Sequence, residues 1–75
     1  MTVTQTSASS VKEVRKGAHL TQAQLAQQVG VSRQTIISIE RGDYAPSVYL
    51  ALKIARELSS KVEQLFHLTD DAPQQ

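Results

Sequence analysis

Cysteine and tryptophan are absent from this sequence, aromatic residues are few, and no long apolar run occurs. The 75-residue chain therefore has no disulfide, no thiolate zinc site and no cysteine nucleophile. No stretch approaches the roughly 20 apolar residues that cross a membrane. The Thr- and Ser-rich start has neither the basic region nor the apolar region of a signal peptide. We expect a cytoplasmic protein that has no association with membranes.

Groups that carry enzyme chemistry are also scarce. His19 and His67 lie in different segments, and their spacing is not that of metal ligands. The sequence shows no Ser-His-Asp set, no carboxylate pair and no phosphate-binding glycine loop. We therefore predict that the protein is not an enzyme and needs no metal and no cofactor. With no second domain and no obvious pocket, a small-molecule ligand is not expected either.

The formal net charge of +1 is uninformative as a total, but the charges are unevenly distributed. Residues 1–45 carry more Lys and Arg than Asp and Glu, whereas residues 46–75 carry slightly more acidic than basic residues. A more basic N-terminal half gives mild support for a nucleic-acid partner.

Helical periodicity dominates the chain, and no alternating strand pattern or internal repeat is visible. The pattern predicts an all-α domain of five helices over residues 9–68, with a flexible arm over residues 1–8 and a polar tail over residues 69–75. Polar residues at the helix starts and glycines at the ends mark the boundaries. The expected N-caps are Ser9 or Ser10, Thr21, Ser32, Ser47 and Ser60. The expected ends of the first three helices are Gly17, Gly30 and Gly42.

Two apolar sets in the C-terminal half recur at helical intervals and are expected in the core. The set on the fourth helix comprises Val48, Ala51, Leu52, Ala55 and Leu58. The set on the short last helix comprises Val62, Leu65 and Phe66. We expect Tyr44 and Tyr49 to pack at the rim of this core.

The second and third helices form one unit from Gln22 to Arg41. Two helices joined by about three residues that include a glycine are typical of the helix-turn-helix motif. Thr21 and Gln24 make a capping box at the start of this unit. The tight crossing requires a small residue where the helices touch, a glycine in the turn and apolar residues facing the core. The residues that meet these requirements are Leu25, Ala26, Val29, Gly30, Val31, Ile36 and Ile39.

The outward face of the third helix indicates the role of this motif. At about 100° per residue, Gln34, Ser38 and Arg41 lie opposite the core side. Arg33 and Ile37 flank them, and no acidic residue lies on this face. Arg can form two hydrogen bonds with guanine, and Gln can do the same with adenine. The pattern predicts a helix that reads the major groove, with an exposed Ile37 beside it that contacts a thymine methyl, a partner subunit or nothing.

From about Val11 to Phe66 the chain resembles the phage repressor/Cro-type helix-turn-helix regulators, also called the XRE family. The resemblance rests on the stretches LTQAQLAQQVGVSRQTIISIERG and YAPSVYLALKIA. It implies a five-helix domain that usually binds operator DNA as a dimer. It also implies a sequence-specific transcriptional regulator, most simply a repressor, whose partner is double-stranded DNA.

The resemblance further implies roles for individual residues. The positions that read bases are Arg33, Gln34 and Ser38. The positions of backbone contacts are Gln22 and Thr35, and generic candidates for phosphate contacts are Lys16, Arg41 and Tyr44. Arg15 and Glu40 match a pair that ties the first helix to the third. Because the phase of the third helix turns Glu40 toward the core, we expect this ion pair to be partly buried.

Two departures from the family pattern affect helix ends. His19 stands where a helix-ending glycine is common, so the first turn is expected to be strained or differently routed. Ser59-Ser60-Lys61 replaces the usual Gly-Val-Ser, which removes a helix stop and a buried valine before the last helix. The geometry of the last helix is therefore the least determined part of the fold.

A single recognition helix reads about half of a typical site, so we expect a symmetric dimer. The residues predicted to pair the subunits are Val62, Leu65, Phe66 and Leu68. The alternative is that only Leu68 is exposed and the other three close the monomer. Two other functions also stay open, namely the DNA-binding antitoxin of a toxin–antitoxin pair and a protein-interaction module that has lost DNA binding. The acid-free face of the third helix argues against the last of these.

Overall fold

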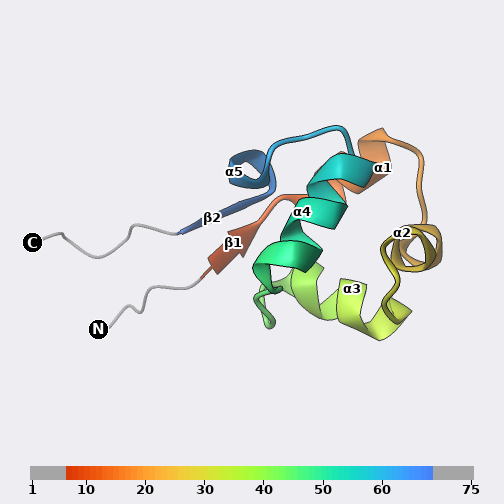
Figure 1. Cartoon of the computed structure of the whole chain (residues 1–75), viewed down its shortest axis with the longest axis horizontal. Coiled ribbons are helices and arrows are strands. Elements are labelled where there is room, and N and C mark those ends of the chain that lie inside the picture. Colours follow the sequence, from red (N-terminus) through yellow and green to blue (C-terminus); the bar gives the residue numbers. More distant parts are fainter. Residues whose placement is uncertain (1–6, 69–75) are drawn as a thin grey trace, which may run out of the picture.

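The structure, a computed structural model, describes residues 7–68. Along this part of the chain, five helices follow one short strand and precede another. Figure 1 shows the two strands side by side. The elements are β1 (Ser7–Ser9), α1 (Val11–Gly17), α2 (Gln22–Val29), α3 (Arg33–Arg41), α4 (Val48–Glu57), α5 (Val62–Leu65) and β2 (Phe66–Leu68). The prediction of a five-helix fold is confirmed. The predicted tail over residues 69–75, and residues 1–6 of the predicted arm, lie outside the described residues.

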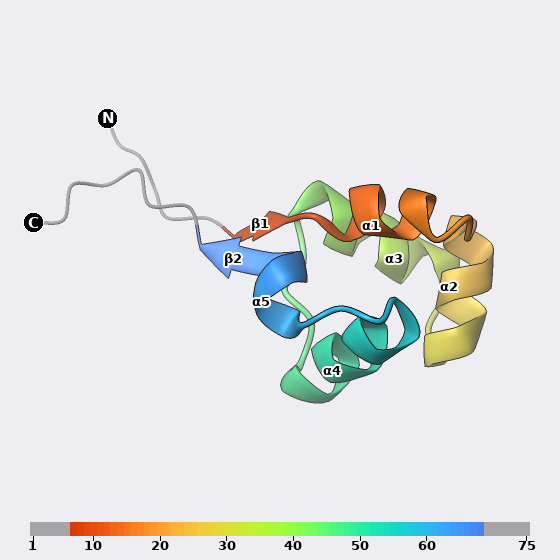
Figure 2. The same ribbon diagram turned by 90° about the horizontal axis from the view of Figure 1, so that it is seen from above.

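The helices enclose one apolar core. α1 lies beside α3 on one side, α4 and α5 lie on the other, and α2 contacts both α3 and α4 at one end (Figure 2). The two strands lie at the opposite end. The core is formed by Val11, Leu25, Ala26, Val29, Ile36, Ile39, Leu50, Ile54, Ala55, Leu58 and Leu65. Within residues 7–68, no helix has both the length and the apolar character needed to cross a bilayer.

A two-stranded sheet, which the sequence does not predict, joins the two ends of the described chain. β1 and β2 are antiparallel, and the register pairs Ser7 with Leu68, Ala8 with His67 and Ser9 with Phe66. Strands of three residues are too short to show a period of two, so no sequence pattern marks them. Ser7 and Ala8 therefore belong to a strand and not to the arm expected there.

The start of the last helix also differs from the prediction. Its N-cap is Lys61, and the Gln64 side-chain oxygen accepts a hydrogen bond of 3.0 Å from the Lys61 N–H. The expected cap, Ser60, instead donates from its hydroxyl to the Leu58 carbonyl at 3.1 Å. Because this bond turns the Ser60 side chain back toward α4, it does not cap α5.

The apolar residues predicted to pair two subunits have different surroundings. Leu65 is fully buried in the core, so the prediction that it contacts a partner is wrong. Val62 and Phe66 are partly buried against the core, and Phe66 lies in β2 and not in the last helix as predicted, because its backbone is extended. The side chain of Leu68 lies outside the described part of the structure.

α4 turns a different edge toward the core than the spacing predicts. Leu50 and Ile54 are buried, together with the expected Ala51, Ala55 and Leu58. The remaining apolar side chains of α4 are exposed: Val48 by 75%, Tyr49 by 79% and Leu52 by 51%. The predictions of core positions for Val48 and Leu52, and of rim packing for Tyr49, are therefore wrong. Apolar residues cover more of the circumference of α4 than the core can bury. The spacing of these residues alone does not show which of them face inward.

A groove of about 800 Å³ opens beside the exposed edge of α4, where the sequence predicts no pocket. Its walls come from α4, from the loop between α3 and α4, and from the α5–β2 region. Apolar side chains in these walls include Tyr44, Val48, Leu52, Val62 and Phe66. The groove exists because the side of α4 that bears Val48 and Leu52 is left uncovered.

The first four helices end in the same way. A backbone N–H beyond each helix donates five residues back, in bonds of 3.2 Å (Leu20 to Arg15), 3.0 Å (Val31 to Ala26), 3.0 Å (Asp43 to Ser38) and 2.8 Å (Ser60 to Ala55). Such an ending requires a left-handed residue just before the donor. The φ angles there are 79° at Gly30, 81° at Gly42, 62° at His19 and 51° at Ser59. The expected strain after the first helix is therefore present at His19, and Ser59 adopts the same unfavourable conformation after α4.

Candidate nucleic-acid interface

Local hydrogen bonds fix both the start of α2 and the turn that leads from α2 to α3. Thr21 N–H donates to the Gln24 side chain at 2.8 Å, and Gln24 N–H donates to the Thr21 hydroxyl at 3.0 Å. This reciprocal pair is the predicted capping box, and it fixes where α2 begins. Gly30 ends the helix in the left-handed conformation, as predicted. The 3.0 Å bond from Val31 N–H to the Ala26 carbonyl then closes the turn.

The third helix presents a polar face to solvent. Ser32 caps α3 by accepting a 3.2 Å hydrogen bond from the Thr35 N–H. Ile36 and Ile39 are buried on the inner side. Arg33 and Gln34 are exposed on the outer side, and Ser38 is partly buried one turn further along. The three predicted base-reading residues thus share one accessible stretch of helix, which is long enough to enter a major groove.

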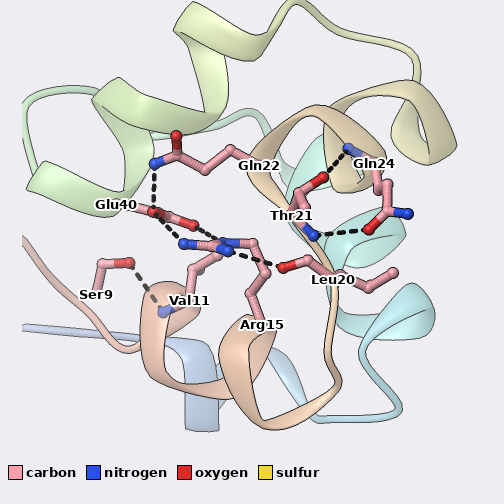
Figure 3. A network of polar contacts seen from close by, with 8 residues as sticks. All are labelled: Ser9, Val11, Arg15, Leu20, Thr21, Gln22, Gln24 and Glu40. Atoms are coloured by element: carbon pink, nitrogen blue, oxygen red, sulfur yellow. Dashed lines mark hydrogen bonds and ion pairs between the residues drawn. The ribbon is translucent and has the colours of Figure 1, made fainter.

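Arg15 and Glu40 form the ion pair that ties α1 to α3 (Figure 3). Arg15 Nε lies 2.5 Å from one Glu40 carboxylate oxygen, and Nη2 lies 3.3 Å from the other. The two side chains are only 8% and 3% exposed, so the predicted burial is confirmed. Arg15 Nη1 also donates to the Leu20 carbonyl at 2.8 Å, which fixes the chain entering α2. The pair therefore holds three segments of the chain together.

Gln22, at the start of α2, is also part of this network. Its Nε2 donates to Glu40 Oε1 at 3.0 Å (Figure 3). An amide nitrogen has two N–H groups, so this bond orients the amide and leaves a second donor. The sequence does not predict this contact, because Gln22 and Glu40 are brought together only by the packing of α2 against α3.

The other candidates for phosphate contacts differ in their surroundings. Lys16 is exposed near the end of α1. Arg41 is exposed at the end of α3 and lies 3.3 Å from Asp43 in an ion pair whose side chains are 70% and 59% exposed. Thr35 is partly buried, and its hydroxyl lies 3.0 Å from that of Ser32. The exposed ion pair between Arg41 and Asp43 is weak, so Asp43 competes only weakly with a phosphate that approaches Arg41.

Tyr44 lies where α3 gives way to the next loop. Its side chain is 47% exposed. It borders a shallow hollow of about 230 Å³ whose other walls are Ser32, Gln34, Thr35 and Ser38. Tyr44 therefore lies beside Gln34 and Ser38, two of the three predicted base-reading residues. Ile37, expected to be exposed there, is instead partly buried.

These features match a known family. A family model described as helix-turn-helix, HTH_3, covers residues 11–65. The chain belongs to this family of DNA-binding transcriptional regulators. The resemblance found in the sequence is thereby confirmed.

Relatives of this helix-turn-helix chain occur in bacteria and archaea. It is 46% identical to the HTH-type transcriptional regulator YgzD of Bacillus subtilis over 63 residues, which cover 84% of this chain and 96% of YgzD. It is 50% identical to an HTH-type transcriptional regulator of Methanothermobacter thermautotrophicus over 62 residues, which cover 81% of this chain and 90% of that one.

Solved structures of related proteins have the same fold. The restriction-modification controller protein C.AhdI of Aeromonas hydrophila is similar with a TM-score of 0.69 and 32% identity, over 75% of this chain and 85% of C.AhdI. A putative DNA-binding protein of Bacteroides fragilis is similar with a TM-score of 0.74 and 28% identity, over 81% of this chain and 98% of that protein.

Proposed function

We propose that this regulator is a repressor that reads operator DNA in the major groove with α3. Arg33, Gln34 and Ser38 would contact base edges. The observation that carries this proposal is that the outward side of α3 bears no acidic residue. The only carboxylate of α3 belongs to Glu40, which is hydrogen-bonded to Arg15 and Gln22. A face without negative charge can approach DNA closely, because it does not repel the phosphates.

Backbone contacts would orient the helix in the groove. Phosphate contacts set register and orientation, whereas base contacts supply sequence preference. The residues proposed for phosphate contacts are Gln22, Thr35, Arg41, Lys16 and Tyr44. Gln22 is already oriented by its bond to Glu40, so little side-chain freedom is lost when it binds.

The proposed working form is a homodimer that acts on DNA in the cytoplasm. One α3 reads about half of a site, and two half-sites about 34 Å apart suit a pair of recognition helices on one side of the duplex. A dimer bound across a promoter would exclude RNA polymerase, which is the simplest route to repression for a domain of this size.

Selection of bound DNA from a random pool tests the proposal directly. We expect a near-palindromic sequence with half-sites about 10 base pairs apart. Affinity for the selected site should fall about 10³–10⁵-fold between 50 and 200 mM salt if the dimer makes roughly 6 to 10 phosphate contacts. No enrichment, together with binding that is insensitive to salt, would exclude DNA as the main ligand.

Substitutions on α3 test the assignment of base readers. Arg33→Ala and Gln34→Ala should each weaken binding to the selected site by about 1–3 kcal/mol and relax preference at one base pair. Lys53→Ala removes an exposed cation from α4 and serves as the matched control, with little expected effect. An equal loss for Arg33→Ala on selected and random DNA would reassign Arg33 to the phosphate backbone.

A further inference from the structure

The groove beside α4 exposes apolar side chains that do not pack into the core of the single chain. Val48 and Leu52 lie one helical turn apart on its edge and are 75% and 51% exposed. Val62 and Phe66 continue the apolar wall on the α5–β2 side. Scattered apolar residues on a surface are ordinary, but a continuous apolar groove marks an interaction site.

The charges at the groove fit a second copy of the same chain. A two-fold interface brings one patch against itself, so the patch must be self-complementary. Arg56 and Lys61 supply positive charge at the groove, and Glu63 supplies negative charge close to them. A rotated copy can therefore place Glu63 against a cation of its neighbour, while the apolar centres meet. A strongly acidic or strongly basic partner would find no such match.

Tyr44 connects this groove to the DNA face. It lines the groove together with Val48 and Leu52, and it also lines the hollow formed by Gln34 and Ser38 on α3. No other residue of the described chain borders both of these hollows. A contact that covers the groove side of Tyr44 therefore restricts a side chain that stands beside the proposed base readers.

We propose that a second copy docks in the groove and that Tyr44 transmits this docking to the base-reading face of α3. The inference rests on the proposed function of α3. In the single chain Tyr44 is 47% exposed, so a large part of its surface is still open to a contact. In the dimer one side is held by the partner, and the other side becomes a fixed wall for the DNA site. Because such coupling is reciprocal, DNA that engages Gln34 and Ser38 also strengthens the dimer.

A dimer could bind a full site more tightly simply because two α3 helices bind at once. A duplex with one half-site has room for only one α3, so any effect of pairing on its affinity must come from coupling between the groove and α3. The association state of the parent is first measured by sedimentation, and affinity for the half-site is then measured above the concentration at which it pairs. Val48→Glu should make the protein monomeric and lower half-site affinity about 5-fold or more. Tyr49→Glu is the matched control, since Tyr49 is 79% exposed on α4 but does not line the groove. It should leave both properties unchanged.

The same comparison in the Tyr44→Ala background identifies the transmitting residue. There, Val48→Glu should still produce monomers, but the half-site affinity should change by less than about 2-fold. A parent that is monomeric, or a Val48→Glu variant that still pairs, overturns docking in the groove. An undiminished loss in the Tyr44→Ala background overturns the role of Tyr44. Failure of the parent to bind any DNA would instead refute the proposed function, and sedimentation would still report on the groove.

Discussion

The face built by α1, α2 and α3 buries a charged network, whereas the face built by α4 and α5 exposes apolar side chains. On the first face, the side chains of Arg15 and Glu40 are 8% and 3% exposed. On the second, Val48 and Leu52 are 75% and 51% exposed. Both faces depart from the ordinary distribution, in which charges stay in water and large apolar groups are covered.

The contrast indicates which interactions each face serves. A buried ion pair contributes little net stability, but it has demanding geometry, so it fixes how α1, α2 and α3 are arranged. That arrangement places Gln22 beside Glu40, near the end of α3. An exposed apolar surface has no demanding geometry and gains free energy when it is covered. The first face is thus suited to precise polar contacts with DNA, and the second to association of subunits.

The largest expected effect comes from breaking the buried pair. Glu40→Ala leaves the Arg15 guanidinium buried without its counter-charge and also removes the acceptor of Gln22. We expect a loss of about 3–5 kcal/mol in the free energy of unfolding, measured with urea. Asp43→Ala breaks the exposed pair with Arg41 and should cost at most about 1 kcal/mol. Equal losses for the two variants would show that Glu40 is not buried in solution.

A smaller effect is expected from the packing of the α2–α3 crossing. Ala26 is 3% exposed, and Ala26→Leu would force additional methylene groups into that contact. Overpacking of this kind typically costs about 1–3 kcal/mol. Ala23→Leu makes the same substitution at an exposed position of α2 and should be nearly neutral in urea unfolding. If both variants are as stable as the parent, the crossing is looser than its burial suggests.

Local signals allowed much of the α1–α3 face to be predicted from the sequence. The capping box at Thr21, the turn at Gly30 and the inward phase of Glu40 each depend on residues a few positions apart. The α4 and α5 face was predicted less well, because its geometry depends on distant contacts. The exposure of Val48 depends on what lies opposite α4, and the β1–β2 pairing joins segments from the two ends of the described chain. Neither leaves a pattern within a short window.

The helix ends allow a comparison that spans both faces. α1, α2, α3 and α4 close with the same five-residue hydrogen bond, but only two of them have glycine at the left-handed position. His19 adopts a φ of 62° after α1, and Ser59 a φ of 51° after α4. A side chain in this conformation costs roughly 1–2 kcal/mol, because its Cβ crowds the following carbonyl.

The smallest predicted effect is a gain in stability from placing glycine at these two positions. His19→Gly and Ser59→Gly remove the crowding, and the greater freedom of glycine in the unfolded chain offsets about 0.4–1 kcal/mol of that gain. We expect each variant to be about 0.5–1 kcal/mol more stable in urea, and the two gains to add, since the residues lie in separate turns. His19→Ala and Ser59→Ala are the controls and should bring no gain, because alanine keeps the Cβ. A gain for alanine equal to that for glycine would place the cost in the side-chain contacts of His19 and Ser59 and not in their backbone.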